Sequence, residues 1–348
     1  MKKLKYLILA LCLSIITSQS QDRSKFLNGT LVVLNKSEAT VTLISLETGK
    51  PVAVLGTGIG PHEVAVSPDG KTAVVCNYGE RPLSTLTVIN IERKRPLNTI
   101  HLGEYQAPHG IEFLPDGEHI IATVERNRAV ILVNIKEGVV EKVIPTGDLS
   151  CHMIAITPDG KRGFAASIGS GAVSVLDIEK GEEIKSILTG KGAEGVAVTP
   201  DGMEAWVTNR EADTICVIDT STLEIIKTIP SASFPIRIKF TPDGKYALVS
   251  NARTGDVAVF DTEHKKELRR ISMEVKAEEG LDGRMFNQFG TSPTPMGIVI
   301  SPDGSHAFIS NTRAGIVTVV DLKTWKIKSR LIAGKEPDGM AYSRLSLK

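Results

Sequence analysis

Residues 193–209 read AEGVAVTPDGMEAWVTN, and this stretch contains the unit from which the chain is built. Apolar and polar residues alternate on either side of a Pro-Asp-Gly turn at 200–202, which is the pattern of two short β-strands joined by a hairpin. The turn recurs at intervals of 47, 43, 42, 42 and 60 residues, each time after a similar alternating segment. Its six copies begin at Pro68, Pro115, Pro158, Pro200, Pro242 and Pro302.

Two more alternating segments follow the hairpin within each repeat. In the repeat quoted above they are TICVID at Thr214–Asp219 and EIIKTIP at 224–230. Four short strands in a unit of about 42 residues are typical of one blade of a β-propeller.

The two ends of the chain complete the count of blades. Residues 30–35, 40–46 and 51–56 have the pattern of strands two to four without a first strand, whereas Pro337–Ser343 has the pattern of a first strand with nothing after it. A ring must join its ends, because an open ring leaves an unpaired strand edge and an exposed core. The sequence therefore predicts an all-β, seven-bladed β-propeller with four antiparallel strands per blade, closed by one C-terminal strand and three N-terminal strands.

The composition excludes several other classes of protein. The 348 residues include 41 Lys+Arg and 40 Asp+Glu, for a net charge of +1, and 41% are hydrophobic. This balance excludes a disordered chain and a coiled coil, and without a broad basic face no nucleic-acid partner is expected. After residue 20 the cysteines are Cys76, Cys151 and Cys216. An odd number is no disulfide framework.

The first 20 residues have the order of a secretory signal. Lys2, Lys3 and Lys5 precede an apolar run at residues 6–16, and small polar residues follow at 17–20. We expect a signal peptide at 1–20 that is cut before Gln21, a linker at 21–29, the propeller at 30–343 and a C-terminal tail at 344–348.

A secretory signal predicts a periplasmic or secreted protein. The apolar run is too short for a transmembrane helix, which needs roughly 20 residues, so no membrane span is expected in the mature chain. Two alternatives are a retained N-terminal anchor and lipid attachment at Cys12. The residues before Cys12 fit a lipoprotein signal poorly, because Leu11 is bulky where a small residue is usual.

The repeats also resemble a known family. The pattern V-x-x-T/S-P-D-G-x-x-A-x-V-x-N, followed by T-x-x-V-x-D, is similar to that of the YVTN or YncE-like seven-bladed propellers, over about residues 28–343. The wider group includes lactonase-like and cytochrome d1-like propellers. The resemblance implies the fold but not the function, because the group contains binding proteins, cofactor carriers and enzymes. The chain has no Cys-x-x-Cys-His, so no covalent c-type haem is expected.

Candidate functional residues lie where the repeats differ from one another. The first strand of each blade lines the central channel, and its second residue differs from blade to blade: His62, His109, His152, Glu194, Ile236, Met296 and Asp338. Three histidines on consecutive blades predict a transition-metal site with an open position. Glu63 or Glu194 would be a fourth ligand or a general base. The alternative is that Pro-His begins a strand as a loop feature copied between neighbouring blades.

Arginines occur on the same predicted face of the ring. Arg237 follows the channel-lining position, and other polar or charged residues follow the second strands: Tyr78, Arg126, Arg210 and Arg253, with Arg313 beside them. Guanidinium groups bind carboxylates and phosphates bidentately, so these residues predict a small anionic ligand. The alternative is a solvated loop in which each arginine pairs with a neighbouring glutamate.

An insertion explains the one long interval between turns. The connection at residues 274–294 is about 17 residues longer than in a 43-residue repeat, and it includes Phe286 and Phe289. We expect this loop on the His/Arg face, with the two phenylalanines over the channel mouth. The alternative is a tolerated surface excursion.

Three functions fit these patterns. The first is an exported propeller that binds a small anionic molecule or a protein segment at the channel mouth. The second is a metal-dependent enzyme, such as a lactonase, lyase or oxidase, that uses the three histidines. The third is a surface interaction protein made of repeats.

Overall fold

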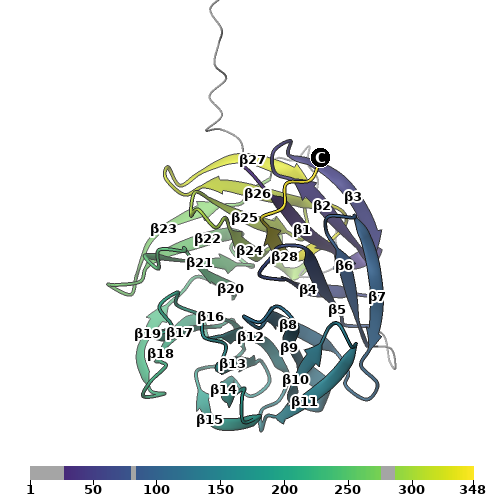
Figure 1. The fold of residues 1–348 in the computed structure, drawn as a ribbon. Coiled ribbons are helices and arrows are strands. Elements are labelled where there is room, and N and C mark those ends of the chain that lie inside the picture. Colours follow the sequence, from purple (N-terminus) through teal and green to yellow (C-terminus); the bar gives the residue numbers. More distant parts are fainter. Residues whose placement is uncertain (1–26, 80–83, 276–286) are drawn as a thin grey trace, which may run out of the picture.

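The chain forms seven four-stranded antiparallel sheets arranged in a ring (Figure 1). The computed structural model describes residues 27–79, 84–275 and 287–348. The expected signal peptide, 1–20, and most of the linker at 21–29 lie outside the described residues. The predicted seven-bladed β-propeller is confirmed. In the described residues, no helix is long and apolar enough to cross a membrane.

Each blade runs outward from the channel in the order of its four strands. Blade 1 contains β4 (Pro61–Val66), β5 (Thr72–Asn77), β6 (Thr85–Asn90) and β7 (Arg95–His101). Blade 2 contains β8 (Pro108–Phe113), β9 (His119–Val124), β10 (Ala129–Asn134) and β11 (Val139–Pro145). Blade 3 contains β12 (Cys151–Ile156), β13 (Arg162–Ser167), β14 (Ala172–Asp177) and β15 (Glu182–Leu188). Blade 4 contains β16 (Ala193–Val198), β17 (Glu204–Asn209), β18 (Thr214–Asp219) and β19 (Ile225–Pro230).

The remaining blades include the one that joins the two ends of the chain. Blade 5 contains β20 (Pro235–Phe240), β21 (Tyr246–Asn251), β22 (Asp256–Asp261) and β23 (Lys266–Ser272). Blade 6 contains β24 (Pro295–Ile300), β25 (His306–Asn311), β26 (Ile316–Asp321) and β27 (Lys326–Ile332). Blade 7 contains β28 (Pro337–Ser343), β1 (Thr30–Asn35), β2 (Thr40–Ser45) and β3 (Lys50–Gly56). Short 3-10 turns are η2 (Lys36–Glu38), η3 (Glu125–Asn127) and η5 (Asn287–Phe289).

Burial is greatest in the two middle strands of a blade and least at its rim. The second strand β5 is buried at five of its six residues, whereas the outermost strand β7 is buried at one of seven. The apolar core lies between neighbouring blades, so that Trp206 of blade 4 is fully buried with its ring edge-on to Phe240 of blade 5 at 5.5 Å. Successive side chains of a strand point to opposite faces, so the unbroken burial along β5 shows that both faces of the blade are covered there.

The Pro-Asp-Gly turns are structural, as the repeat predicts. In the turn at 200–202, Asp201 accepts hydrogen bonds from the Thr199 hydroxyl at 2.5 Å and the Met203 N–H at 3.0 Å. Gly202 has a φ of +77°, which a side chain would strain. The turn carboxylate is thus used within its own hairpin and is not free to bind a metal.

The ends of the chain close the ring in blade 7. β28 pairs with β1 in an antiparallel register that places Ser343 opposite Thr30. The residues after β28 continue this closure, because Leu347 is 6% exposed in a cluster that contains Val64 of blade 1. The Thr30 hydroxyl donates to the Leu345 carbonyl at 2.6 Å. The segment expected as a tail therefore packs across the joint between blades 7 and 1.

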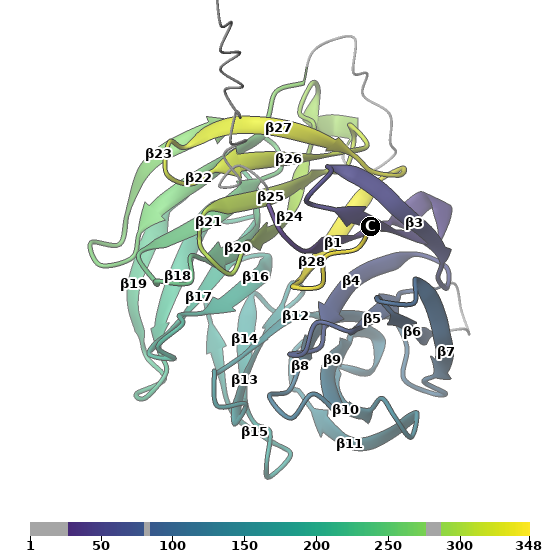
Figure 2. The same cartoon turned by 45° about the horizontal axis from the view of Figure 1, so that its top comes forward.

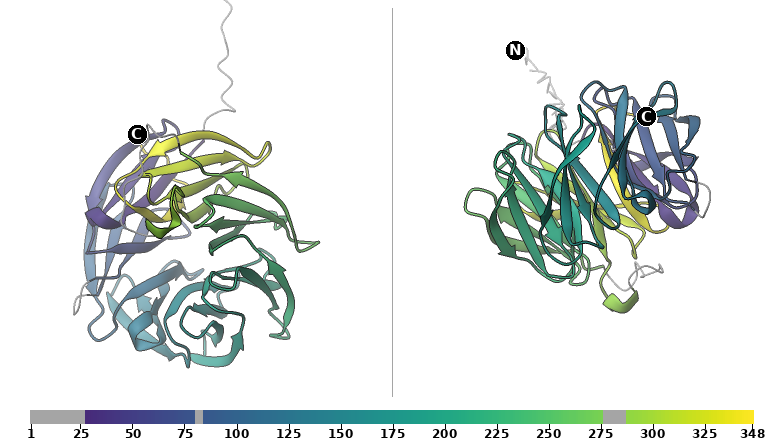
Figure 3. Two further views of the ribbon diagram at one scale, coloured as in Figure 1. Left: turned by 180° about the vertical axis from the view of Figure 1, so that it is seen from behind. Right: turned by 90° about the horizontal axis from the view of Figure 1, so that it is seen from below.

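The seven first strands surround the centre of the ring (Figure 2). All of them begin on the face of the ring where the second strands end, and this face is called the mouth below. The turns at Pro-Asp-Gly lie on the other face. The 3-10 turn η5 projects from one face of the ring, as the two views of Figure 3 show.

Candidate functional site at the channel mouth

A backbone feature repeated in every blade sets the start of each first strand. The residue before the strand has a positive φ, between 52° and 73°, and its carbonyl accepts the N–H of the first residue after the second strand at 2.9–3.2 Å. Five of the seven are not glycine and lie in a sparsely populated region. They are Gly60, Ala107, Ser150, Gly192, Phe234, Thr294 and Glu336.

A β-bulge follows immediately. The pairing of β4 with β5 shifts between Pro61 and Glu63, and the pairing of β12 with β13 shifts between Cys151 and Met153. A bulge adds one residue and re-aims the side chain there. His62 and His152 occupy these two bulges, so local backbone geometry gives the second residue of the strand its special direction.

The three histidines that share this position come together. The ring centroids of His62 and His109 are 4.5 Å apart, and those of His109 and His152 are 3.6 Å apart. Gly110 allows this proximity, because a Cβ there would lie 2.7 Å from the Met153 Cα and the Ile154 nitrogen. The close approach of β8 to β12 thus brings the rings into contact.

A glutamate completes the cluster with two of these histidines. One ligand atom each from His109, Glu125 and His152 can be chosen so that all three lie within 4.8 Å of one another. Glu125 directly follows β9 and contacts the His152 Nδ1, while the Tyr78 hydroxyl donates to its other oxygen at 2.6 Å. The Nδ1 of His109 is buried with no hydrogen-bond partner among the described residues.

His62 has a different environment from the other two histidines. Its Nδ1 lies 3.1 Å from an Asp338 oxygen and 3.3 Å from the Lys36 Nζ. Asp338 is 1% exposed and holds the equivalent strand position in blade 7. The sequence pattern groups His62 with the metal ligands, whereas the geometry groups it with this carboxylate and lysine.

Arg237 crosses the channel from blade 5 to blade 1. Its Nη2 is 2.7 Å and its Nε 3.0 Å from one oxygen of Glu63, and its Nη1 is 3.0 Å from Glu194. The side chain is 7% exposed. Arg237 thus contacts the two glutamates that the sequence offers as a base or a fourth ligand, and three of its five N–H donors are used by them.

The other arginines on the mouth also have partners. Arg210 contacts Glu194 at 2.6 Å, and Arg126 lies over the Tyr78 ring at 5.9 Å. Arg313 donates to the carbonyl of Gly290 at 2.6 Å. These contacts lie within the protein, so the arginines support the structure of the mouth.

The described part of the insertion packs on the apolar half of the ring. Phe289 is 8% exposed in a cluster with Ile236 and Met296, and the Arg253 guanidinium lies 5.2 Å from its ring centroid. The second phenylalanine, Phe286, lies outside the described residues. Phe289 therefore covers the first-strand starts of blades 5 and 6.

Comparison with known proteins agrees with this architecture. Residues 116–282 match a family model described as a YNCE-like beta-propeller. The chain is a YncE-like β-propeller. No curated protein sequence matches it.

Two solved structures illustrate how widely this propeller occurs. Hydrazine synthase of Kuenenia stuttgartiensis superimposes with a TM-score of 0.72 and 21% identity, over 84% of this chain and 92% of that chain. A functionally unknown protein from Desulfotomaculum acetoxidans DSM 771 gives a TM-score of 0.73 at 16% identity, over 90% of this chain and 99% of that one. At such identities the likeness shows the fold alone.

Burial and neighbouring charges set the protonation states of side chains in the mouth of this YncE-like propeller. Burial and the neighbouring histidines hold the pKa of His109 well below its usual value, so it is neutral. Burial also opposes charge on His152, but contacts with Glu125 and Glu194 outweigh it and raise the pKa of His152. Burial would raise the pKa of Asp338, yet His62 and Lys36 lower it to about 2.

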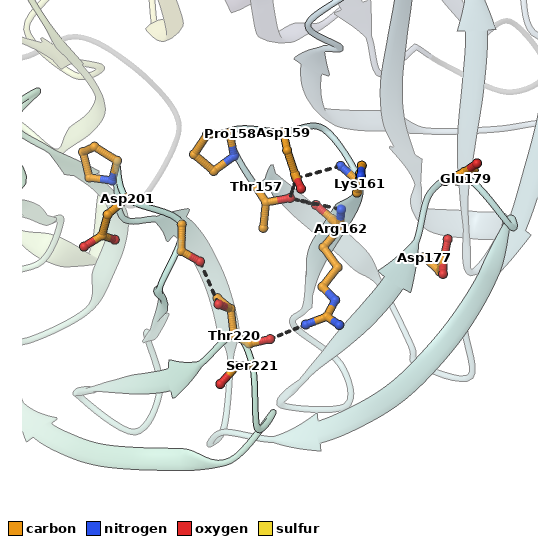
Figure 4. Close-up of a pocket in the computed structure, with 12 residues that line it drawn as sticks. Thr157, Pro158, Asp159, Lys161, Arg162, Asp177, Glu179, Asp201, Thr220 and Ser221 are labelled. Carbon is orange, nitrogen blue, oxygen red and sulfur yellow. Dashed lines mark hydrogen bonds between the residues drawn. The ribbon is translucent and has the colours of Figure 1, made fainter.

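A separate groove lies on the turn face of the YncE-like propeller, between blades 3 and 4 (Figure 4). Its volume is about 660 Å³, and its walls include turn residues such as Asp159 and Asp201. Asp159 accepts from Thr157 in its own turn, and Arg162 donates to the Thr220 carbonyl. Because these polar groups already form hydrogen bonds within the protein, the groove is a weaker candidate for a functional site than the mouth.

Proposed function

We propose that this YncE-like propeller binds a divalent transition-metal ion at the channel mouth through His109, His152 and Glu125. The observation that carries the proposal is the proximity of their ligand atoms, all within 4.8 Å of one another. Two imidazoles and a carboxylate are a donor set suited to zinc, copper, iron or nickel. Metal–nitrogen bonds of about 2.1 Å place the ligand atoms of one ion within roughly 4 Å of one another, so the observed separations are close to those of a formed site.

The hydrogen-bonding state of these side chains supports the proposal. The unpartnered Nδ1 of His109 is a buried polar atom that an ion would satisfy. Glu125 is held by Tyr78, so its carboxylate is oriented before any ion arrives. Such outer partners are typical of metal sites in proteins.

An ion at this site would also provide a binding position for the small anionic ligand that the sequence predicts. Three protein donors leave a coordination position open to water or to an anion that approaches from the mouth. The arginines support direct anion binding less well, because Arg237 and Arg210 both contact Glu194. A lactonase, lyase or oxidase activity would use the same open position.

Metal analysis tests the proposal. Untagged protein is expected to bind one Zn²⁺ or Cu²⁺ per chain by calorimetry and elemental analysis. His109→Ala should weaken this binding at least about 100-fold, because it removes one of three ligands. His264→Ala is the matched control, since His264 is exposed and contacts Asp261.

Two results would contradict the metal proposal. One is a wild-type protein that takes up no ion under any loading condition. The other is equal affinity in His109→Ala and His264→Ala, with circular dichroism showing that both are folded.

We also propose that the protein is exported to the periplasm or beyond. The support is the order of lysines, apolar run and small polar residues within residues 1–20. N-terminal sequencing of the protein from a periplasmic extract should begin at Gln21. Ile8→Arg, which puts a charge into the apolar run, should leave uncut protein in the cytoplasm. Recovery of the wild-type chain with Met1–Ser20 still attached would contradict cleavage.

A further inference from the structure

We propose that Glu194 is a positioning residue for the metal site: it holds the Nε2 side of His152, so that Nδ1 is presented to the ion beside Glu125. This inference rests on the proposed metal site. It assigns Glu194 a role other than the ligand or base that the sequence suggests. The three-residue group of possible ligands contains Glu125 and not Glu194.

The contacts of His152 separate its two ring nitrogens. Nδ1 contacts Glu125, the proposed ligand, whereas Nε2 lies 3.4 Å from Oε1 of Glu194. A ligating histidine commonly donates its other N–H to a carboxylate, which fixes the ring orientation and raises ligand basicity. The Nε2–H of His152 pointing at Glu194 is this arrangement.

Glu194 is itself held rigidly on both oxygens. Oε2 accepts from Arg210 at 2.6 Å, and Oε1 accepts from Arg237 at 3.0 Å. The carboxylate is 3% exposed. Both oxygens of Glu194 already accept hydrogen bonds from guanidinium groups. Glu194 would have to give up these contacts to bind an ion, so it is a poor metal ligand.

The support for Glu194 extends to the opposite side of the channel. Arg237 is fixed at its far edge by Glu63, through contacts of 2.7 and 3.0 Å. The series Glu63–Arg237–Glu194–His152 therefore links blades 1, 5, 4 and 3 around the channel. Arg237 and Glu194 each have a charged partner on both sides, which leaves the His152 ring little freedom to rotate.

Four proteins test this role with Cu²⁺ as the probe: wild type, Glu194→Gln, Glu194→Asp and Glu112→Gln. Glu194→Gln should bind Cu²⁺ about 10- to 100-fold more weakly and alter its electron paramagnetic resonance spectrum. Glu194→Asp keeps the charge but withdraws the carboxylate from His152, so we expect a similar loss. Glu112→Gln is the control, because Glu112 is also on an inner strand, β8, and its recorded ion pair is with Lys239, at 3.6 Å, and not with a histidine.

The outcomes separate the two proposals. If wild type binds Cu²⁺ and both Glu194 variants match it in affinity and spectrum, the positioning role is overturned while the metal site stands. If Glu194→Asp alone matches wild type, charge rather than position matters and the inference is also overturned. If wild type binds no Cu²⁺, both proposals fail together.

A more conservative variant guards against loss of folding. Arg210→Gln removes one of the two guanidinium contacts of Glu194, and Arg210 is partly exposed at 21%. It should weaken Cu²⁺ binding several-fold, less than Glu194→Gln does. Unchanged binding in a folded Arg210→Gln protein, together with unfolded Glu194 variants, would count against the inference.

Discussion

Replacing Arg237 with Met is expected to lower the free energy of unfolding by about 3–5 kcal/mol. The guanidinium contacts Glu63 and Glu194, and all three side chains are at most 12% exposed. Without Arg237 the Glu63 carboxylate loses its guanidinium partner and Glu194 loses one of its two, and a buried unpaired charge is strongly destabilising. Urea denaturation followed by circular dichroism measures the change.

A second arginine provides the matched control for this change. Arg270→Met removes a two-point contact with Glu267 on strand β23, but this pair is largely solvated. Its effect should stay below about 1 kcal/mol. Adding Glu63→Gln and Glu194→Gln to Arg237→Met should restore part of the loss, since it removes the uncompensated charges. Equal stability of the two arginine variants would disprove the structural role given to Arg237.

Replacing Leu347 with Ala is expected to cost about 2–5 kcal/mol of unfolding free energy. Leu347 is 6% exposed among residues of blades 7 and 1, including Leu34 and Val75. Its removal leaves a cavity between blades 7 and 1, next to the blade in which the two ends of the chain pair. Chemical denaturation again gives the measurement.

Leu188→Ala is the control for the closure of the ring. It makes the same chemical change at a residue that is 77% exposed on β15. It should therefore leave the denaturation midpoint nearly unchanged. If the two leucine variants unfold at the same urea concentration, the C-terminal residues do not stabilise the joint.

The repeat makes the architecture predictable from the sequence. A Pro-Asp-Gly turn fixes the phase of every blade, so the sequence places His62, His109 and His152 at one level of the channel. The centroids of successive rings in this series do lie within 4.5 Å of each other. The position of a residue within its repeat can be counted from the nearest Pro-Asp-Gly turn, so a local sequence pattern is enough to predict it.

The partners of these side chains are not predictable in the same way. Arg237 and Glu63 are 174 residues apart, and nothing in either repeat indicates that one reaches the other across the channel. Nothing in the repeat singles out Glu125 as a ligand, although its position directly after β9 is a signal that it faces the mouth. Contacts across the ring depend on the distance between blades, which periodicity does not encode.

The positive-φ residues that precede the first strands have a consequence for how such rings diversify. Their carbonyls bind backbone N–H groups, so the anchoring makes no use of the side chain two positions later. That position is occupied by imidazole, carboxylate, thioether or alkyl groups in different blades without a change of scaffold. The inner wall therefore has seven equivalent positions whose side chains can vary. Single substitutions at these positions can introduce new chemical groups into the channel while the ring stays intact.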